Sequence, residues 1–521
     1  MPAYSPGFRS LDAEHDDLAL DVDGEIPAWL SGSLVRNGPG KFEVGGERVE
    51  HWFDGLAMLH KFRFEEGQNG VTYSNRFLRT DAYREAVKEG RLTSQFATSG
   101  SYLDQLKSFV GDPTDNANVN VARVGGEYVA LTETPRRVRF APESLAAEGD
   151  LAYGDDMTVH HTTAHLQRDD RRGETVGYAT TFGRTNRYHL YRVPDDPPAE
   201  GALPQRIPIA SIEVERPAYL HSFALTPRYA VVIEPPFVTN PMRFLLPGQG
   251  GFIDNFRWKP ERGTRFLAFE RDSGDLAVER RVEPFFFFHT VNAFESGGDL
   301  VVDLVAYDDA DIVSNLFMGA VEGEENDVDE ETEMGEVRAP ETGPELAAAD
   351  GELARFRVPV EETGDADADA NVTRRNLYTG TELPRTSPAV RMAQYRYAYG
   401  QATRREGQNG LVKVNVETGA ATEWWADGHY AGEPIFVPKP AEETCGETAE
   451  KAGDGEAEES ASDDARPEDR GVVLAPALDA DREESLLVVL DGESFEELAR
   501  AEVPHHIPFG FHGEFFPEVE Q

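Results

Sequence analysis

Short runs of alternating hydrophobic and polar residues dominate the chain, and turn-forming residues separate them. Examples are VNVARVGGEYVALTET (119–134), YAVVIEP (229–235), DLVVDLVAYDD (299–309) and SLLVVLDGESFEELARAEV (485–503). A period of two residues is typical of β-strands with one buried face. GG, GD and DG between such runs are typical of hairpin connections. Helical periodicity is confined to short pieces such as 101–110, so the pattern predicts an all-β protein.

The number of predicted strands favours one large fold with a repeated sheet. Many short strands at near-regular spacing are typical of a sandwich, a barrel or a propeller. For 521 residues, a propeller of roughly six to eight four-stranded blades is the economical arrangement. No sharp internal sequence repeat supports it, so the propeller rests here on strand count. We expect residues 1–521 to form a single domain.

Three acidic segments of low complexity interrupt the strand pattern, at about 321–345, 361–370 and 441–470. They contain too few apolar residues to fold independently, and none has the spaced ligands and central glycine of an EF-hand loop. We interpret them as surface loops inserted into the domain. Cys445, the single cysteine, lies in one of them. The chain therefore has neither a disulfide framework nor a thiolate metal site.

The chain is strongly acidic, with 96 Asp and Glu against 50 Lys and Arg and a net charge of −46. Only eight of the basic residues are Lys. Such a surface suits a halophilic cytoplasm, where salt screens the repulsion between like charges. A protein that binds cations or basic partners is the alternative. The charge argues against nucleic-acid binding, which requires clustered Lys and Arg.

No segment of the sequence predicts secretion or membrane insertion. There is no run of about 18 apolar residues, the length that a transmembrane helix needs. The first residues, MPAYSPGFRSLDAEHDD, lack the basic and apolar regions of a signal peptide. We therefore expect a cytoplasmic protein.

Four of the 13 histidines share a context, a strand edge flanked by apolar or small residues. They are His165 in TTAHLQ, His221 in AYLHSF, His289 in FFFFHT and His512 in GFHGEF. A single histidine on an apolar strand is more often a hydrogen-bonded core residue than a ligand. Four of them on different blades of a propeller would face one central axis and hold a metal there. Spacings of 56, 68 and 223 residues are compatible with both interpretations.

Motifs along the whole chain resemble those of the carotenoid cleavage oxygenase family. They are LSGSLVRNGPGKFE (30–43), HWFDGLAMLHKFRF (51–64), TDNANVNV, LTET, the four histidine contexts and the terminal FHGEF. The resemblance implies a seven-bladed β-propeller with helices and loops capping the face above a central iron. It also implies one Fe(II) per chain, bound by His165, His221, His289 and His512. The family commonly has Pro after the first of these histidines, where this chain has Leu166.

The resemblance further implies that three glutamates orient three of the histidines. The matching positions are Glu133 in LTET, Glu382 in TELPR and Glu433 in GEPIFVP, paired with His221, His289 and His512 respectively. His165 would have no carboxylate of its own. Taken alone, each glutamate would be an ordinary residue at a strand end. A carboxylate that accepts the second ring N–H of a ligating histidine fixes its tautomer and makes it more basic.

The implied reaction is cleavage of a conjugated C=C bond with O₂, giving two aldehyde or ketone products. Four neutral imidazoles suit ferrous iron and leave coordination positions open. Control over which bond is cut would come from how the protein positions the substrate. The alternatives within the resemblance are cleavage of a stilbene and isomerase or isomerohydrolase chemistry on a retinoid at the same iron. A propeller that binds a partner without catalysis is a further alternative.

Three features bear on the substrate. Thr132 stands before the first glutamate, where stilbene-cleaving relatives have Lys, and this favours an apolar polyene. Residues 235–258, PPFVTNPMRFLLPGQGGFIDNFRW, form either a tunnel mouth with a membrane-facing patch or a core-packing loop. Their acidic surroundings oppose strong attraction to anionic lipids.

By strand alternation we expect Phe287 to face the iron axis beside His289, with Phe286 and Phe288 packed inside the blade.

Overall fold

The computed structural model describes residues 2–92, 97, 113–199, 201–245, 251–322, 351–360, 372–405, 407–440 and 467–517. The predicted helical piece 101–110, the acidic segment 361–370 and nearly all of 321–345 and 441–470 lie outside these residues. No helix in the described part of the chain is long and apolar enough to cross a bilayer.

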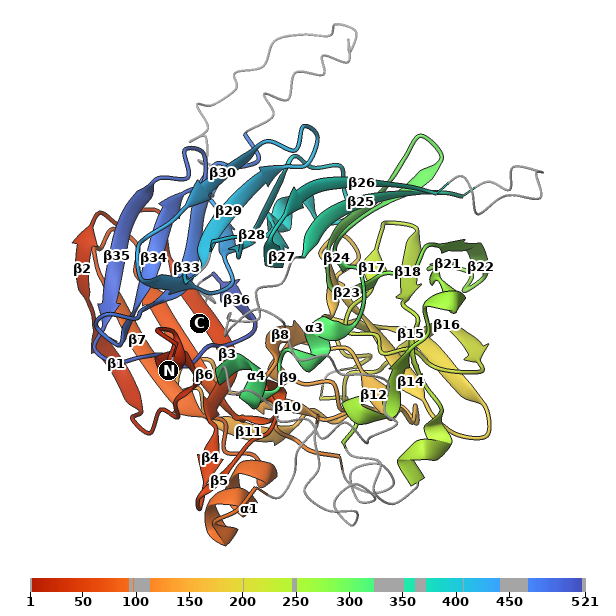
Figure 1. Cartoon of the computed structure of the whole chain (residues 1–521), viewed down its shortest axis with the longest axis horizontal. Coiled ribbons are helices and arrows are strands. Elements are labelled where there is room, and N and C mark those ends of the chain that lie inside the picture. Colours follow the sequence, from red (N-terminus) through yellow and green to blue (C-terminus); the bar gives the residue numbers. More distant parts are fainter. Residues whose placement is uncertain are drawn as a thin grey trace, which may run out of the picture.

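Seven antiparallel sheets are arranged around a central axis, which confirms the predicted propeller (Figure 1). Sheet 1 contains β1 (His15–Ala19), β7 (Val71–Phe77), β6 (Leu56–Phe64), β3 (Gly32–Lys41) and β36 (Gly513–Phe516). Sheet 2 contains β11 (Ala147–Asp150), β10 (Arg137–Phe140), β9 (Glu127–Leu131) and β8 (Asn120–Val124). Sheet 3 contains β12 (His161–Thr162), β14 (Glu174–Thr181), β15 (Asn186–Pro194) and β16 (Ile207–Val214), with β13 (Gln167–Asp169) paired to β14.

The remaining four sheets complete the ring. Sheet 4 contains β17 (Ala224–Leu225), β18 (Tyr229–Glu234), β21 (Thr264–Glu270) and β22 (Leu276–Val282). Sheet 5 contains β23 (Phe286–Ser296), β24 (Asp299–Tyr307), β25 (Glu352–Pro359) and β26 (Thr373–Thr379). Sheet 6 contains β27 (Thr381–Thr386), β28 (Tyr397–Ala402), β29 (Gly410–Asn415) and β30 (Ala421–Trp424). Sheet 7 contains β2 (Asp21–Gly24), β35 (Glu497–Val503), β34 (Glu484–Asp491), β33 (Gly471–Asp479) and β31 (His429–Ala431), with β32 (Ile435–Pro438) paired to β33.

Strands from the two ends of the chain are exchanged between sheets 7 and 1. The last strand, β36, pairs with β3 in sheet 1, and the early strand β2 pairs with β35 in sheet 7. The ring is therefore closed twice by backbone hydrogen bonds. This closure also brings His512, directly before β36, to the axis.

Hairpin geometry follows the predicted turns. Gly125 and Gly126 connect β8 and β9 with φ of 57° and 85°. Both values lie in the left-handed region, which glycine adopts without a steric penalty and which a two-residue hairpin turn of this hand requires.

The hydrophobic core lies between neighbouring sheets. One cluster joins sheets 7 and 1 and includes Phe62, Tyr73, Leu474 and Leu487, all fully buried. Burial of such side chains stabilises the fold by about 1.5–3 kcal/mol each. Two short helices, α3 (Asp311–Ser314) and α4 (Met318–Glu322), lie near the middle of the ring in Figure 1.

The prediction for the phenylalanine run is wrong in its orientation. Phe287 packs with Phe285 in the core between sheets, whereas Phe288 lines the central cavity beside His289. The reason is a bulge in β23. Its pairing with β24 shifts between Phe287 and Thr290, so two residues stand opposite one and strict alternation is lost. Phe288 and His289 therefore face the same space.

Candidate metal centre

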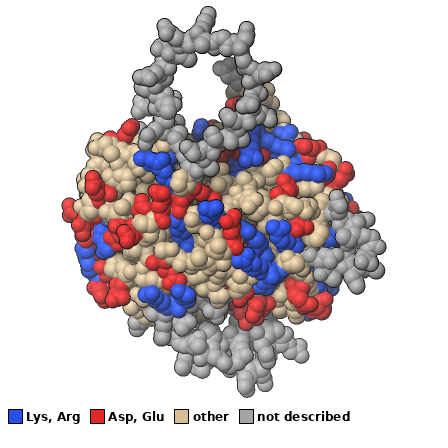
Figure 2. Space-filling model, turned by 90° about the horizontal axis from the view of Figure 1, so that it is seen from above, with Lys and Arg blue, Asp and Glu red and all other residues tan. Residues whose placement is uncertain are grey.

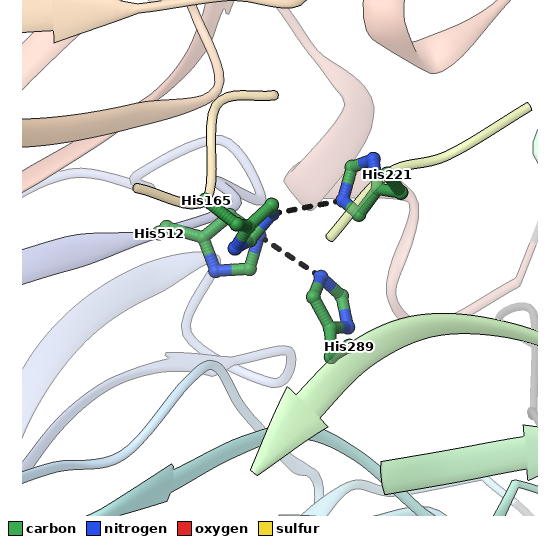
Figure 3. Close-up of side chains that lie close together, drawn as sticks. All are labelled: His165, His221, His289 and His512. Carbon is green, nitrogen blue, oxygen red and sulfur yellow. Dashed lines mark hydrogen bonds between the residues drawn. The ribbon is translucent and has the colours of Figure 1, made fainter. Parts of the chain in front are cut away.

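Four histidine side chains from four sheets converge on the propeller axis (Figure 3). His165 lies between β12 and β13, His221 precedes β17, His289 belongs to β23, and His512 precedes β36. Their ligand atoms all lie within 4.8 Å of one another. Nε2 of His165 is 2.9 Å from Nε2 of His221, and Nε2 of His289 is 3.2 Å from Nε2 of His512.

A glutamate contacts the far side of three of these rings. Oε1 of Glu133 lies 2.7 Å from Nδ1 of His221. Oε2 of Glu382 lies 2.6 Å from Nδ1 of His289, and Oε1 of Glu433 lies 2.8 Å from Nδ1 of His512. These are the three pairs that the motifs predict. Because each carboxylate accepts the Nδ1 proton, the Nε2 lone pair of each ring points to the centre.

The seven residues come from seven different sheets. Sheets 1, 3, 4 and 5 supply the histidines, and sheets 2, 6 and 7 supply Glu133, Glu382 and Glu433. Each side chain stands at or next to the innermost part of its blade. The site therefore depends on closure of the whole ring.

His165 differs from the other three histidines. No carboxylate among the described residues hydrogen-bonds to its ring, and the residue is half-buried. Its backbone N–H donates to Oγ1 of Thr163 at 2.8 Å, and that hydroxyl donates to the carbonyl of His221 at 2.6 Å. Arg137, 2% exposed, donates to the carbonyls of Thr132 and Thr163. One buried guanidinium thus ties the Glu133 turn to the turn before His165.

Tyrosines hold two of the glutamates. The hydroxyl of Tyr219 donates to Oε2 of Glu133 at 2.9 Å, and that of Tyr307 donates to Oε1 of Glu382 at 2.6 Å. Burial acts to raise the pKa of Glu133, but His221 and His161 outweigh it and lower the pKa to about 2. Burial likewise acts to raise the pKa of Glu382, but His289, Tyr307 and the backbone N–H of Leu383 outweigh it and lower that pKa. Both carboxylates are therefore ionised acceptors.

Two arginines hold the third glutamate. Arg36 forms an ion pair with Oε2 of Glu433, and Nε of Arg385 donates to Oε1 at 2.7 Å. The backbone N–H of Gly513 donates to Oε2 at 3.0 Å. Burial acts to raise the pKa of Glu433, yet Arg385, Arg36 and His512 together hold it well below its usual range. The two guanidinium groups carry two positive charges, whereas the carboxylate of Glu433 carries one negative charge.

The four histidines are suited to a divalent metal ion. Burial lowers the pKa of His165, His221 and His512, the last to about 3, so these rings are neutral. Lone pairs about 3 Å apart repel one another unless a cation lies between them. Imidazole binds transition metals at about 2.1 Å, and two such ligands at a right angle would be about 3.0 Å apart. The Nε2 separations of 2.9 and 3.2 Å match this value.

A large, mostly apolar cavity reaches the histidines from one side. Near them its wall contains Phe288, Phe511 and Thr132, and further away Trp52 and Leu316. Apolar walls with a few polar groups are typical of small-molecule sites. Behind the histidines lies a second, more polar opening, whose wall includes Arg168, Asp170 and Glu514.

Comparison with known proteins identifies the family. The family described as "Retinal pigment epithelial membrane protein" matches residues 8–517. The human mitochondrial carotenoid-cleaving dioxygenase is 30% identical over 554 residues, covering 99% of this chain and 91% of the relative. The chain belongs to the carotenoid cleavage oxygenase family.

Further members of the family agree with this assignment. Human beta,beta-carotene 15,15'-dioxygenase is 28% identical, covering 98% of this chain and 94% of the relative. The crystal structure of cobalt-substituted Synechocystis apocarotenoid oxygenase has a TM-score of 0.77 and 26% identity, and the match covers 99% of this chain and 98% of that one. The fold is thus that of an established family.

The sequence did not single out four residues that support the carboxylates. Arg36 lies within the motif LVRNGP, and Arg385 follows TELP. Both arginines therefore belong to motifs that the sequence already shares with the family. Tyr219 precedes His221 by two positions on the same short segment. Tyr307, at the end of β24, carries no local signal, because its contact with Glu382 exists only in the folded ring.

Proposed function

We propose that this chain is a non-haem Fe(II)-dependent dioxygenase that cleaves a conjugated C=C bond of a carotenoid or apocarotenoid with O₂. The products would be two carbonyl compounds. The observation that carries the proposal is a cluster of four histidines, three of them oriented by carboxylates, at the wall of a large apolar cavity. The relatives named as carotenoid-cleaving and apocarotenoid oxygenases support it.

His165, His221, His289 and His512 would hold the iron through Nε2. When bound, iron would activate O₂ for addition across the double bond. The Synechocystis apocarotenoid oxygenase has been crystallised in a cobalt-substituted form, which supports a transition metal at the matching site. Glu133, Glu382 and Glu433 would keep the rings in one tautomer and orientation.

The protein would contribute to the reaction by positioning and by excluding water. Phe288 and Phe511 line the cavity beside the histidines, and their rings would press one segment of a flat polyene against the centre. No side chain needs to act as a nucleophile. Thr132 also lines this part of the cavity. Its hydroxyl is a poor base, so it supports an apolar polyene rather than a phenolic stilbene.

The test is reconstitution with Fe(II) without oxygen, followed by O₂ and product analysis against carotenoids, apocarotenals and stilbenes. We expect about one iron per chain and carbonyl products that require O₂. His289→Ala should lose iron and activity, while His189→Ala, which alters a histidine of β15, should keep both. Activity without iron, or turnover of a retinoid without oxygen and without cleavage, would contradict the proposal.

We further propose a cytoplasmic protein that contacts membranes peripherally through residues 235–258. Met242 in this segment is 63% exposed, whereas Phe237, Phe244 and Phe256 are buried. One exposed apolar side chain supports weak contact only. Flotation with neutral phosphatidylcholine vesicles should carry part of the protein upward, and Met242→Ser should reduce this fraction. If the wild type and Met242→Ser float to the same extent, residues 235–258 do not mediate the membrane contact.

We also propose that residues 1–521 form one propeller domain with acidic insertions at about 321–345, 361–370 and 441–470. Limited proteolysis should cut within these segments first. The nicked protein should remain assembled and unfold in one calorimetric transition, because strands on both sides of each insertion belong to the same ring. Separation of the fragments without denaturant would contradict a single domain.

A further inference from the structure

One end of the large cavity carries polar groups that the iron site does not use. Residues 507–512 run along the cavity wall, from Ile507 to the proposed ligand His512. A segment of this length spans at most about 18 Å. At the Ile507 end the cavity is also lined by His60 and Ser485, which are 4% and 3% exposed.

His60 presents a hydrogen-bond donor to this end of the cavity. Its Nδ1 lies 2.7 Å from the hydroxyl of Tyr73. Among the described residues Nδ1 of His60 is the one hydrogen-bond partner of the Tyr73 hydroxyl, so we assign the phenol as donor and Nδ1 as its acceptor. The imidazole must then carry its own proton on Nε2. His60 lines the cavity, and the bond to Tyr73 is the one hydrogen bond of its ring among the described residues.

Ser485 presents a second donor. Its Oγ accepts the backbone N–H of Ile507 at 2.8 Å, and its own backbone N–H donates to the carbonyl of His505 at 2.9 Å. These bonds fix the residue and leave the hydroxyl proton without an acceptor among the described residues. A buried donor without an acceptor is costly, and an acceptor on a ligand removes that cost.

The end of the cavity is neutral despite these polar groups. Burial, with smaller contributions from His505, Arg36 and His506, lowers the pKa of His60 to about 3. The guanidinium of Arg36, on the neighbouring strand, is paired with Glu433. Two neutral donors suit an uncharged oxygen better than a carboxylate, which would lose its hydration without gaining a counter-charge.

We propose that His60 and Ser485 bind a neutral oxygen, a hydroxyl or a ketone, on the end group of the polyene. This inference rests on the proposed function. It narrows the substrate class to polyenes with an oxygenated end, because a hydrocarbon ring would leave both donors unsatisfied. His60 and Ser485 would determine specificity and the position of the polyene along the cavity, without touching the bond that is cut.

The experiment compares matched polyenes of equal length on the iron-loaded protein. Their end rings carry no oxygen, a hydroxyl or a ketone, and a fourth ends in a carboxylate. We expect kcat/KM to be about tenfold or more higher for the hydroxyl and ketone forms, the value of one or two net hydrogen bonds. His60→Phe and Ser485→Ala should each reduce this preference. His60→Gln, which keeps an N–H, and Ser485→Thr, which keeps the hydroxyl, should retain most of it.

The unsubstituted polyene separates the two proposals. Cleavage of none of the substrates by the iron-loaded wild type would defeat the proposed function. Cleavage of all of them with equal kcat/KM, or an equal loss for all in His60→Phe and Ser485→Ala, would overturn the end-group site alone. A circular dichroism spectrum and an iron content equal to those of the wild type show that a variant is folded.

A second position in the cavity serves as a comparison. Asn409 is 6% exposed, lines another part of the wall and forms no side-chain hydrogen bond among the described residues. If Asn409→Leu removes the preference for oxygenated ends while His60→Phe keeps it, the assignment to His60 and Ser485 is wrong.

Discussion

Nδ1 of His289 lies 2.6 Å from Oε2 of Glu382, a residue 93 positions further along the chain. The other carboxylate oxygen accepts a hydrogen bond from Tyr307. The ring of His289 is thereby held in one orientation, with its second nitrogen directed at the other histidines. Metal binding and ring closure are linked through this contact, because the two residues belong to neighbouring sheets.

Replacement of this carboxylate should weaken metal binding. In Glu382→Gln the acceptor is neutral and the imidazole becomes less basic, so we expect a 10- to 100-fold loss of metal affinity, the usual effect of such a change. Competition with a chelator measures it. Glu502→Gln, at a side chain that is 42% exposed, is the control. Identical affinities in the two variants would show that Glu382 does not support the site.

The corresponding change at Glu433 should reduce stability more than that at Glu382. Glu433→Gln leaves Arg36, which is 6% exposed, without its counter-charge, whereas Arg385 keeps the carboxylate of Glu514 at 3.7 Å. Loss of one partner of a buried ion pair costs about 3–5 kcal/mol. Guanidinium unfolding of both metal-free variants measures the difference. The expectation fails if Glu382→Gln is the less stable protein.

Phe287 and Phe288 should have separable effects. Phe287 fills the core between sheets, so Phe287→Ala should lower the free energy of unfolding by about 3–5 kcal/mol and leave substrate selection unchanged. Phe288→Ala also removes cavity wall beside His221 and His289. In Phe288→Ala the ratio of kcat/KM for a long polyene to kcat/KM for a short one should therefore differ from that of the wild type. Product analysis with both polyenes measures this ratio. If this ratio shifts in Phe287→Ala and not in Phe288→Ala, Phe287 and not Phe288 lines the cavity.

His51 should contribute to the acid sensitivity of the fold. Burial lowers its pKa from 6.5 to about 4, while its ring donates to the carbonyl of Val313 and accepts from the backbone N–H of Phe53. As pH falls from 6.5 to about 4, the unfolded chain takes up a proton that the folded chain does not. Stability is therefore lost across this window, by up to about 3 kcal/mol.

Unfolding titrations at pH 7 and pH 4.5 test this expectation. His51→Gln removes the titrating group, so its stability should fall less between the two pH values than that of the wild type. A variant with His15→Gln, at a half-buried histidine of β1, is the control. Parallel curves for wild type and His51→Gln would contradict the assignment.

Salt should stabilise the protein. Acidic and basic side chains are interspersed on the face shown in Figure 2, but the net charge is −46 and repulsion prevails. Raising the salt from about 0.1 M to about 1 M shortens the Debye length from about 10 Å to about 3 Å. The melting temperature should rise with KCl in a thermal scan. A constant or falling melting temperature would argue against a halophilic surface.

Much of the architecture follows from local sequence. The period of two residues and the GG turn at 125–126 predict strands and hairpins that the structure contains. The resemblance to the family predicts the three histidine–glutamate pairs, and each pair is in contact. Spacing alone left the histidines undecided, because residues 223 positions apart carry no information on their separation in space.

The sequence by itself determined the strand-rich fold, the residue types of the centre and its charge. The tertiary structure decided which side chains share the cavity. The bulge in β23 turned Phe288 toward the cavity in place of Phe287, since it depends on pairing with β24. Closure of the ring likewise placed Arg36 and Arg385 around Glu433. Long-range pairing sets such contacts, and no local pattern encodes it.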